Sequence, residues 1–189
     1  MQHATISTLA ETDYLSGEAT SPVRHEYVAG QVYAMAGASK AHNTIAGNIF
    51  SRIRQHLRGS PCRSFIADMK VRVGQARAYY YPDVVVTCSG QDTVADAPKD
   101  YLIAPALIVE VLSESTESID RREKMHAYAM LDSLQEYLLV DSRSQQAELY
   151  RKLPGGSWEQ WIAEPGESLK LDSLGLELAV NEIYEDAVL

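Results

Sequence analysis

The chain has 189 residues, of which 46% are hydrophobic and 23% are charged. This length and composition predict one globular domain over residues 1–189, with a buried apolar core. No run of about 18 apolar residues is present, so we expect no membrane-spanning helix and no membrane partner. The first residues lack the basic and apolar segments of a secretion signal, which favours a cytoplasmic protein.

The net charge of −9 argues against a general nucleic-acid binder, but the basic residues are unevenly distributed. Residues 40–77 contain eight Lys and Arg residues and a single acid, Asp68. Such asymmetry can give an acidic protein one basic face. The alternative is a set of scattered solvated charges, because clustering along a chain is not clustering in space. The candidates for phosphate contacts are Lys40, Arg52, Arg54, Arg58, Lys70 and Arg72.

The chain contains two cysteines, Cys62 and Cys88. So few cysteines indicate a reducing compartment rather than a disulfide framework. We therefore expect both to pack as small apolar side chains rather than to act as nucleophiles.

The N-terminal part of the chain is predicted to form two helices separated by a hairpin. Residues 5–17 are expected to form a short helix, and residues 24–35 a β-hairpin in which Gly30 supplies the positive φ of a tight turn. Ser39 can cap the second helix, whose apolar residues recur at helical spacing. His42, in its first turn, is expected to be a surface or packing residue, with a position facing a pocket as the alternative.

The middle of the chain is predicted to form three strands and a helix. The strands are expected at residues 63–73, 78–88 and 106–113, where β-branched and aromatic residues end at turn signals. Residues 89–105 are long for a simple connection, so we expect a helical turn or an active-site flap there. The helix is expected over residues 117–131.

The C-terminal part is predicted to contain more strands. A strand is expected at residues 136–141, a hairpin is formed by residues 146–152 and 158–163, and a short strand with a helical turn lies within residues 175–184. Taken with the preceding elements, this order predicts a mixed sheet covered by helices.

Two carboxylates, Asp83 and Glu110, lie within apolar runs that are typical of buried strands. An ionised carboxylate among apolar neighbours needs a cation, a proton or a strong hydrogen-bond donor. Two such groups suggest a shared hard metal ion, since Mg²⁺ binds oxygen ligands and typically uses one or two carboxylates. The alternative is that Asp83 ends a strand and Glu110 forms an unrelated buried ion pair.

Several motifs occur together in this chain. Residues 81–86 are Tyr-Pro-Asp-Val-Val-Val, residues 109–116 are Val-Glu-Val-Leu-Ser-Glu-Ser-Thr, and Asp120, Lys124 and Tyr128 follow at helical spacing. This combination resembles the Uma family of the PD-(D/E)XK nuclease superfamily, although a Pro-Asp pair alone is common. The resemblance extends over nearly the whole chain.

The resemblance implies an α/β (α+β) fold of the restriction-endonuclease-like type. Its αβββαβ core would occupy about residues 20–152, with a mixed sheet flanked by helices and β-hairpin additions at both ends. It also implies cleavage of a phosphodiester bond with Mg²⁺ or Mn²⁺. Asp83, Glu110 and the backbone carbonyl of Val111 would hold the metal.

The chain departs from the superfamily pattern at one position. That pattern has a lysine two residues after the second acid, where this chain has Leu112. Lys124 on the following helix is the expected replacement, because a lysine beside the site can stabilise developing negative charge. Glu26, in the N-terminal hairpin, is expected to complete the acid cluster.

The expected function is a metal-dependent endonuclease that cuts DNA. A homodimer is the expected assembly, because most soluble oligomers are symmetric and a double-strand cut is simplest with two sites. The competing expectation is a catalytically inactive nuclease fold that binds DNA or a protein partner. The missing lysine and the acidic net charge favour this alternative, whereas the retained acids and Lys124 favour the enzyme.

Overall fold

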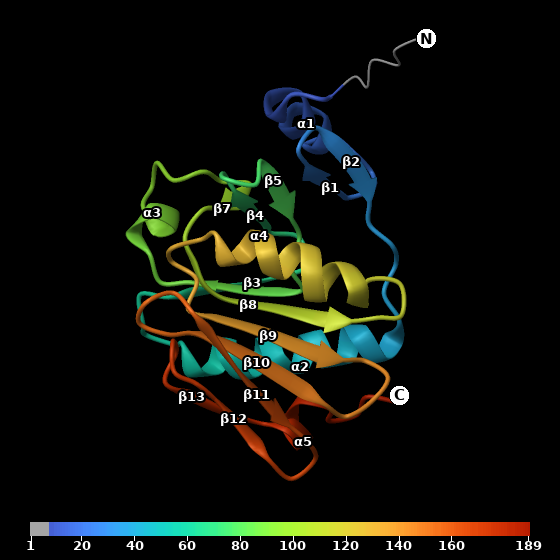
Figure 1. Ribbon diagram of the computed structural model, residues 1–189, viewed down its shortest axis with the longest axis vertical. Coiled ribbons are helices and arrows are strands. Elements are labelled where there is room, and N and C mark those ends of the chain that lie inside the picture. The colour runs from blue at the N-terminus through green and yellow to red at the C-terminus, as the bar shows by residue number, and fades with distance from the viewer. Residues whose placement is uncertain (1–7) are drawn as a thin grey trace.

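The computed structural model describes residues 8–189 and arranges most strands in two sheets (Figure 1). The larger sheet has six strands in the order β11-β10-β9-β8-β6-β3, and the smaller has five in the order β2-β1-β5-β4-β7. A separate hairpin, β12-β13, follows the larger sheet in the chain. The predicted mixed sheet flanked by helices is therefore confirmed, but its strands are divided between two sheets.

The elements have the following bounds. The strands are β1 (His25–Val28), β2 (Gln31–Ala34), β3 (Arg63–Ile66), β4 (Lys70–Val73), β5 (Ala78–Tyr80), β6 (Val84–Thr87), β7 (Tyr101–Leu102), β8 (Pro105–Leu112), β9 (Glu136–Asp141), β10 (Ala147–Lys152), β11 (Trp158–Ala163), β12 (Ser168–Leu171) and β13 (Leu176–Ala179). The helices are α1 (Glu11–Glu18), α2 (Lys40–His56), α3 (Gly90–Thr93), the π-helix η1 (Ile119–Lys124), α4 (Met125–Ala129) and α5 (Val180–Ile183). Among residues 8–189, no helix is long and apolar enough to cross a membrane.

The larger sheet is covered on both faces, by α2 on one side and by α4 on the other (Figure 1). Because successive side chains of a strand point to opposite faces, its central strands supply both layers. In β6, Val84 and Val86 pack in the layer of α2, whereas Val85 packs in the layer of α4. In β8, Val109 and Ile108 divide in the same way. Strands buried on both faces explain the near-continuous apolar runs in the sequence.

The predicted strands 63–73 and 78–88 are each broken in two, which corrects the sequence analysis. In each case one half belongs to the larger sheet and the other half to the smaller sheet. The first break contains Ala67, whose φ of 57° ends the extended run. The second contains Pro82, which has no N–H to donate to a sheet. The chain therefore crosses between the sheets at both breaks.

Several other predicted elements are confirmed. The β1–β2 hairpin turns at Ala29 and Gly30, which have φ values of 48° and 95°. Helix α2 begins after Ser39, whose hydroxyl accepts a hydrogen bond of 3.1 Å from the N–H of His42. The segment 89–105 contains the expected helical turn, α3, and the strands β9 to β11 lie where they were expected.

Two predicted helices differ from the structure. The first begins only at Glu11, and residues 5–7 of that prediction lie outside the described residues. The second, expected over residues 117–131, is a π-helix followed by the short helix α4. The strand β12 (Ser168–Leu171) was not expected. It has only four residues and is flanked on both sides by turn-forming segments.

The expectation of two free cysteines is wrong, because Cys62 and Cys88 form a disulfide. Strands β3 and β6 pair with Arg63 opposite Thr87, so the two cysteines that flank this pair face each other. The composition of the chain could not reveal this pairing, since it depends on the register of the two strands. The disulfide links the residue before β3 to the residue after β6.

Candidate active site

The four acidic and basic residues predicted for catalysis come together beside the two sheets. Glu26 lies on β1, Asp83 at the second crossing, Glu110 on β8 and Lys124 at the end of η1. The ammonium of Lys124 lies 2.9 Å from Glu26 Oε1 and 3.3 Å from Glu110 Oε1. It also lies 3.2 Å from Asp120 Oδ1. We call Glu26, Asp83, Glu110, Asp120 and Lys124 the acid cluster.

Asp83 is held from two sides. Its Oδ2 accepts a hydrogen bond of 2.7 Å from the backbone N–H of Val111, and its Oδ1 lies 2.8 Å from Nε2 of His42. In a strand the carbonyl of a residue points to the same side as its N–H, so the Val111 carbonyl also faces the Asp83 side of β8. His42 is half-buried and packs against the acid cluster through Asp83.

The pKa of His42 reflects two opposing influences. Burial, the largest single influence, lowers the pKa, whereas the hydrogen bond and the charge of Asp83 raise it. The net result is a pKa above the usual value for histidine. His42 was not among the predicted site residues, and its place in the first turn of α2 was the only signal in the sequence.

Glu110 and Lys124 are almost completely buried, with exposed fractions of 3% and 6%. Burial raises the pKa of Glu110 well above its usual range, and the neighbouring acids add to this although Lys124 opposes it. For Lys124, burial lowers the pKa, but Glu110, Glu26 and Asp120 outweigh burial and raise that pKa well above its usual range. The two pKa values therefore rise for different reasons, which are mainly burial for Glu110 and mainly the neighbouring carboxylates for Lys124.

Asp120 shows the same excess of negative charge. Its side chain is buried, and within residues 8–189 its Oδ1 accepts no hydrogen bond, although it lies at ion-pair distance from Lys124. Asp120 and Lys124 both belong to the π-helix η1, at the end of which the N–H of Met125 donates to the carbonyl of Asp120 five residues earlier. π-Helical turns frequently occur at functional sites.

Three tyrosines surround the acid cluster. The hydroxyl of Tyr128 donates to Glu110 Oε1 at 3.1 Å, and that of Tyr137 donates to the carbonyl of Asp120 at 3.1 Å. The ring of Tyr80 lies 5.8 Å from the Lys124 ammonium. The sequence analysis missed Tyr80 and Tyr137, whose signal was that a buried tyrosine hydroxyl needs a partner.

The position that carries the superfamily lysine is filled by an apolar side chain. Leu112 is buried in the layer of α4, together with Ile108 and Tyr128. Glu110 lies between Ile108 and Leu112 on the same strand face, since alternate residues share a face. The ammonium therefore reaches the acid from the helix that covers this face rather than from the strand itself.

Comparison with known proteins identifies the family. The chain matches Uma2, described as "Putative restriction endonuclease", over residues 11–181. The chain belongs to the Uma2 family. The resemblance inferred from the sequence motifs is thereby confirmed, and the family places the chain among nuclease-like proteins.

Relatives of this Uma2 protein occur in cyanobacteria. The "Uncharacterized protein slr1290" of Synechocystis sp. is 39% identical, over 93% of this chain and 91% of its own. The "Uncharacterized protein sll1609" of the same organism is 30% identical, over 82% of this chain and 87% of its own. A crystal structure described as "a putative nuclease belonging to DUF820 from Anabaena variabilis" has a TM-score of 0.74 at 19% identity. It covers 92% of this chain and 96% of its own, which confirms the expected restriction-endonuclease-like fold.

The acid cluster of this Uma2 protein fits a divalent cation in its chemistry. Three carboxylates lie within 3.3 Å of the Lys124 ammonium, and the fourth, that of Asp83, pairs with His42. The carboxylates of the cluster therefore outnumber its lysine, and Oδ1 of Asp120 accepts no hydrogen bond within residues 8–189. Carboxylate and carbonyl oxygens are the ligands that Mg²⁺ and Mn²⁺ prefer. As the side chains lie, no group of three His, Cys, Asp or Glu residues in the described part of the chain has the geometry of a metal site. His42 and Val111 instead occupy the two oxygens of Asp83.

The residues predicted to contact phosphates do not all lie free on the surface. Arg52 pairs with Glu182 and Glu185, and Arg72 pairs with Glu11. Lys70 is buried and donates to the hydroxyl of Tyr81, and burial lowers its pKa. The exposed members of the set are Lys40, Arg54 and Arg58. A role of these residues in binding nucleic acid stays a prediction.

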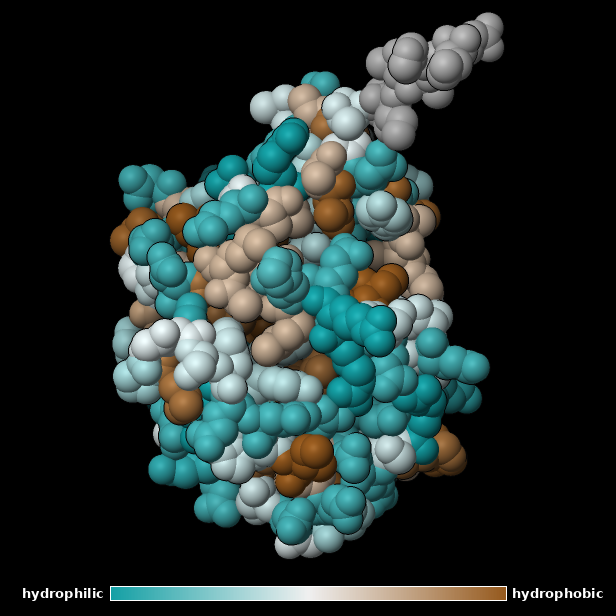
Figure 2. Space-filling model, in the orientation of Figure 1, coloured by the Kyte–Doolittle hydropathy of each residue, from teal (hydrophilic) through white to brown (hydrophobic). Residues whose placement is uncertain are grey.

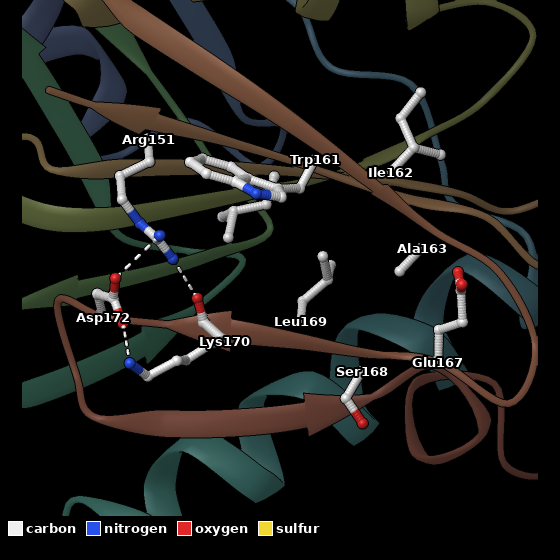
Figure 3. A pocket seen from close by; sticks show the side chains of 10 residues that line it. Arg151, Trp161, Ile162, Ala163, Glu167, Ser168, Leu169, Lys170 and Asp172 are labelled. Carbon is white, nitrogen blue, oxygen red and sulfur yellow. Dashed lines mark hydrogen bonds and ion pairs between the residues drawn. The ribbon is translucent and has the colours of Figure 1, made fainter.

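A hollow of about 420 Å³ lies away from the acid cluster, between β11 and β12 (Figure 3). Figure 3 shows the guanidinium of Arg151 beside Trp161, with its carbon 4.6 Å from the ring centroid. Arg151 also pairs with Glu136 at 2.8 Å and with Asp172 at 2.9 Å. Since Arg151 is already paired, we assign the candidate active site to the acid cluster and not to this hollow.

Proposed function

We propose that this protein is a metal-dependent endonuclease that hydrolyses phosphodiester bonds of DNA. One observation carries the proposal: a buried lysine ammonium lies within 3.3 Å of three carboxylates that come from separate parts of the chain. Fixed charges in such a buried site interact strongly with charge that develops on a substrate. Hydrolysis of an anionic diester depends mainly on electrostatic stabilisation of its transition state. Membership of the Uma2 family supports the same class of reaction.

Each residue has a role in this proposal. Asp83, Glu110 and the carbonyl of Val111 would hold Mg²⁺ or Mn²⁺, which when bound would activate water and polarise the phosphoryl group. Lys124 would stabilise negative charge that develops on the phosphate. Glu26 would keep the ammonium of Lys124 in place through their 2.9 Å ion pair.

The alternative is an inactive nuclease fold that binds DNA or a protein partner. It is favoured by Asp83, because both oxygens of this candidate ligand are already occupied within the protein. Metal binding in the presence of that arrangement requires the side chain of His42 to give way. Calorimetry with Mg²⁺ or Mn²⁺, combined with a cleavage assay, therefore distinguishes the nuclease from the inactive fold.

The test compares Asp83→Asn and Glu110→Gln with the unchanged protein. Both variants are expected to lose metal binding by calorimetry and cleavage of supercoiled plasmid, while circular dichroism shows an intact fold. Glu148→Gln is the matched control, because Glu148 is also buried but lies outside the acid cluster. Cleavage that persists in both site variants, or that needs no metal, would overturn the proposal.

Two further features belong to this proposal. We place the protein in the cytoplasm, where its proposed DNA substrate is found, and we propose that it acts as a homodimer. The disulfide between Cys62 and Cys88 is unusual for a reducing compartment. Trapping of free thiols in intact cells with an alkylating reagent therefore tests the proposed location.

A further inference from the structure

The outer strands of the two large sheets differ in how they are protected. Natural sheets protect an edge by short length, charged residues, proline or bulges. At the ends of the sheets, β7 has only two residues, β3 carries Arg63, and β11 carries Glu159. In contrast, β2 has four residues and contains no charge and no proline. Within residues 8–189 it pairs only with β1.

The side chains of β2 and its surroundings are apolar as well as exposed. All four residues of β2 are exposed, including Val32 at 42% and Tyr33 at 54%. Met35, which follows β2 in the chain, and Leu9, which lies beside Val32, are exposed as well. Apolar side chains are visible at the surface in this part of the molecule, below the grey N-terminal atoms (Figure 2). Contiguous exposed apolar surface is a mark of protein interaction sites.

We infer that β2 is the interface through which two copies of this chain form a dimer. The strand is self-complementary, because an uncharged strand meets its own copy without repulsion between like charges. Antiparallel pairing of β2 with β2 of a second copy would join the two five-stranded sheets into one sheet of ten strands. A two-fold axis perpendicular to the sheet generates this pairing, so the same face of both copies lies on one side.

This dimer has a consequence for the candidate active sites, which rests on the proposed function. Glu26 lies on β1, directly beside β2, and pairs in register with Tyr33. Two β1 strands separated by both β2 strands lie three strand spacings apart, about 14 Å. This separation is comparable with the roughly 12 Å width of the DNA major groove. The two β1 strands, each carrying the Glu26 of its acid cluster, would therefore lie at a spacing that suits opposite strands of one duplex.

Sedimentation of the full chain tests the interface directly. The unchanged protein is expected to sediment as a dimer, and Val32→Lys as a monomer, because a charge on this strand would face its own copy. Ile162→Lys is the matched control: Ile162 is also 54% exposed and lies on the outer strand β11, so this variant should remain a dimer. Ala34→Lys provides a second variant of β2 if Val32→Lys does not fold. A monomeric unchanged protein, or a β2 variant that folds and remains dimeric, would overturn the inference.

Plasmid cleavage separates this inference from the proposed function. The Val32→Lys monomer should still nick supercoiled plasmid, but its ratio of linear to nicked product should fall roughly tenfold, because the second cut no longer comes from a linked site. A dimer that cuts no DNA would refute the proposed function and leave the interface intact. A monomeric variant that linearises plasmid as efficiently as the unchanged protein would refute the paired-site arrangement.

Discussion

At the scale of single residues, Lys124 defines the chemistry of the candidate site. Its pKa is raised well above the usual range by Glu110, Glu26 and Asp120, against the effect of burial. The side chain therefore stays charged at neutral pH, and it cannot act there as a general base that takes a proton from water. Its role in the proposed reaction is electrostatic, in a site where burial raises the pKa of the neighbouring Glu110 well above its usual range.

Lys124→Met should abolish DNA cleavage and keep metal binding, because the carboxylates remain and only the cation is removed. The variant should also lose about 3–5 kcal/mol of unfolding free energy, the usual effect of breaking a buried ion pair. Denaturant unfolding, calorimetry with Mn²⁺ and plasmid cleavage measure the three quantities. Lys124→Arg should restore little activity, since a broad guanidinium does not replace a compact ammonium. A folded Lys124→Met variant that cuts plasmid at the normal rate would remove Lys124 from the mechanism.

Glu148 gives the protein a dependence on pH outside the candidate site. Its carboxylate accepts hydrogen bonds of 2.8 and 2.6 Å from Arg121, and these bonds lower the pKa of Glu148. A carboxyl group with a lowered folded pKa stabilises the fold above its unfolded pKa, and this stability is lost as the pH falls through the folded value.

Glu148→Gln should therefore lower the free energy of unfolding at pH 7 by about 1–3 kcal/mol. The difference from the unchanged protein should begin to shrink as the pH falls through about 4.3, where the unfolded carboxyl takes up its proton, and should disappear only below the lower pKa of the folded state. Urea unfolding at a series of pH values measures this difference. Glu159→Gln, which removes an exposed acid from β11, is the control. A difference that stays constant from pH 7 to pH 3 would contradict the linkage.

The sequence identified the residues of the site that carry a motif, but not those that support them. Asp83 and Glu110 could be predicted because a charge within an apolar run needs a partner, and Lys124 because the resemblance called for a lysine that is missing at Leu112. The partners of His42 and Tyr137 could not be predicted, because these contacts join distant segments of the chain. The hydroxyl of Tyr137, for example, meets a backbone carbonyl of η1, which the periodicity of β9 does not reveal.

At the scale of elements, the sequence predicted the types of structure better than their continuity. The pattern of alternating side chains continues through Ala67 and Pro82, so each predicted strand was assigned to a single sheet. The division between the sheets depends on the left-handed backbone of Ala67, on the missing N–H of Pro82, and on which strands pair on each side of these residues. The π-helix was hidden for a similar reason, since Asp120 and Lys124 share a face in either kind of helix.

The disulfide is an element-scale feature with a measurable effect. It spans a sequence separation of 26 residues that includes β4, β5 and Asp83. The joint change of Cys62→Ala and Cys88→Ala should lower the free energy of unfolding by about 3–4 kcal/mol, because the unfolded chain gains freedom. Denaturant unfolding with and without a reducing agent measures this, and the reducing agent should affect only the unchanged protein. Two free thiols in the unreduced, denatured protein would show that the bond is absent.

At the scale of the molecule, we propose that residues 1–189 form one domain. The two apolar layers on either side of the larger sheet share the strands β6, β8 and β9. Unfolding of one layer would therefore expose the strands that also carry the other layer. The unit of stability is expected to be the whole chain rather than either layer.

A pair of core substitutions tests this proposal. Ile49→Ala removes a buried side chain from the layer of α2, and Leu134→Ala removes one from the layer of α4. Each should cost about 2–5 kcal/mol and shift one common unfolding transition. Calorimetry and circular dichroism should report the same midpoint in both variants. Two separate transitions, each sensitive to only one substitution, would contradict a single domain.

The crossings between the sheets also bear on how such an enzyme is made in a cell. Glu26, Asp83, Glu110 and Lys124 occupy four segments that meet only when both sheets have formed. A chain that is still leaving the ribosome has synthesised its first two acids long before its lysine. For the proposed nuclease, the ability to damage the chromosome of its host would arise only at the end of folding. Unfinished or misfolded copies would be harmless to the cell that produces them.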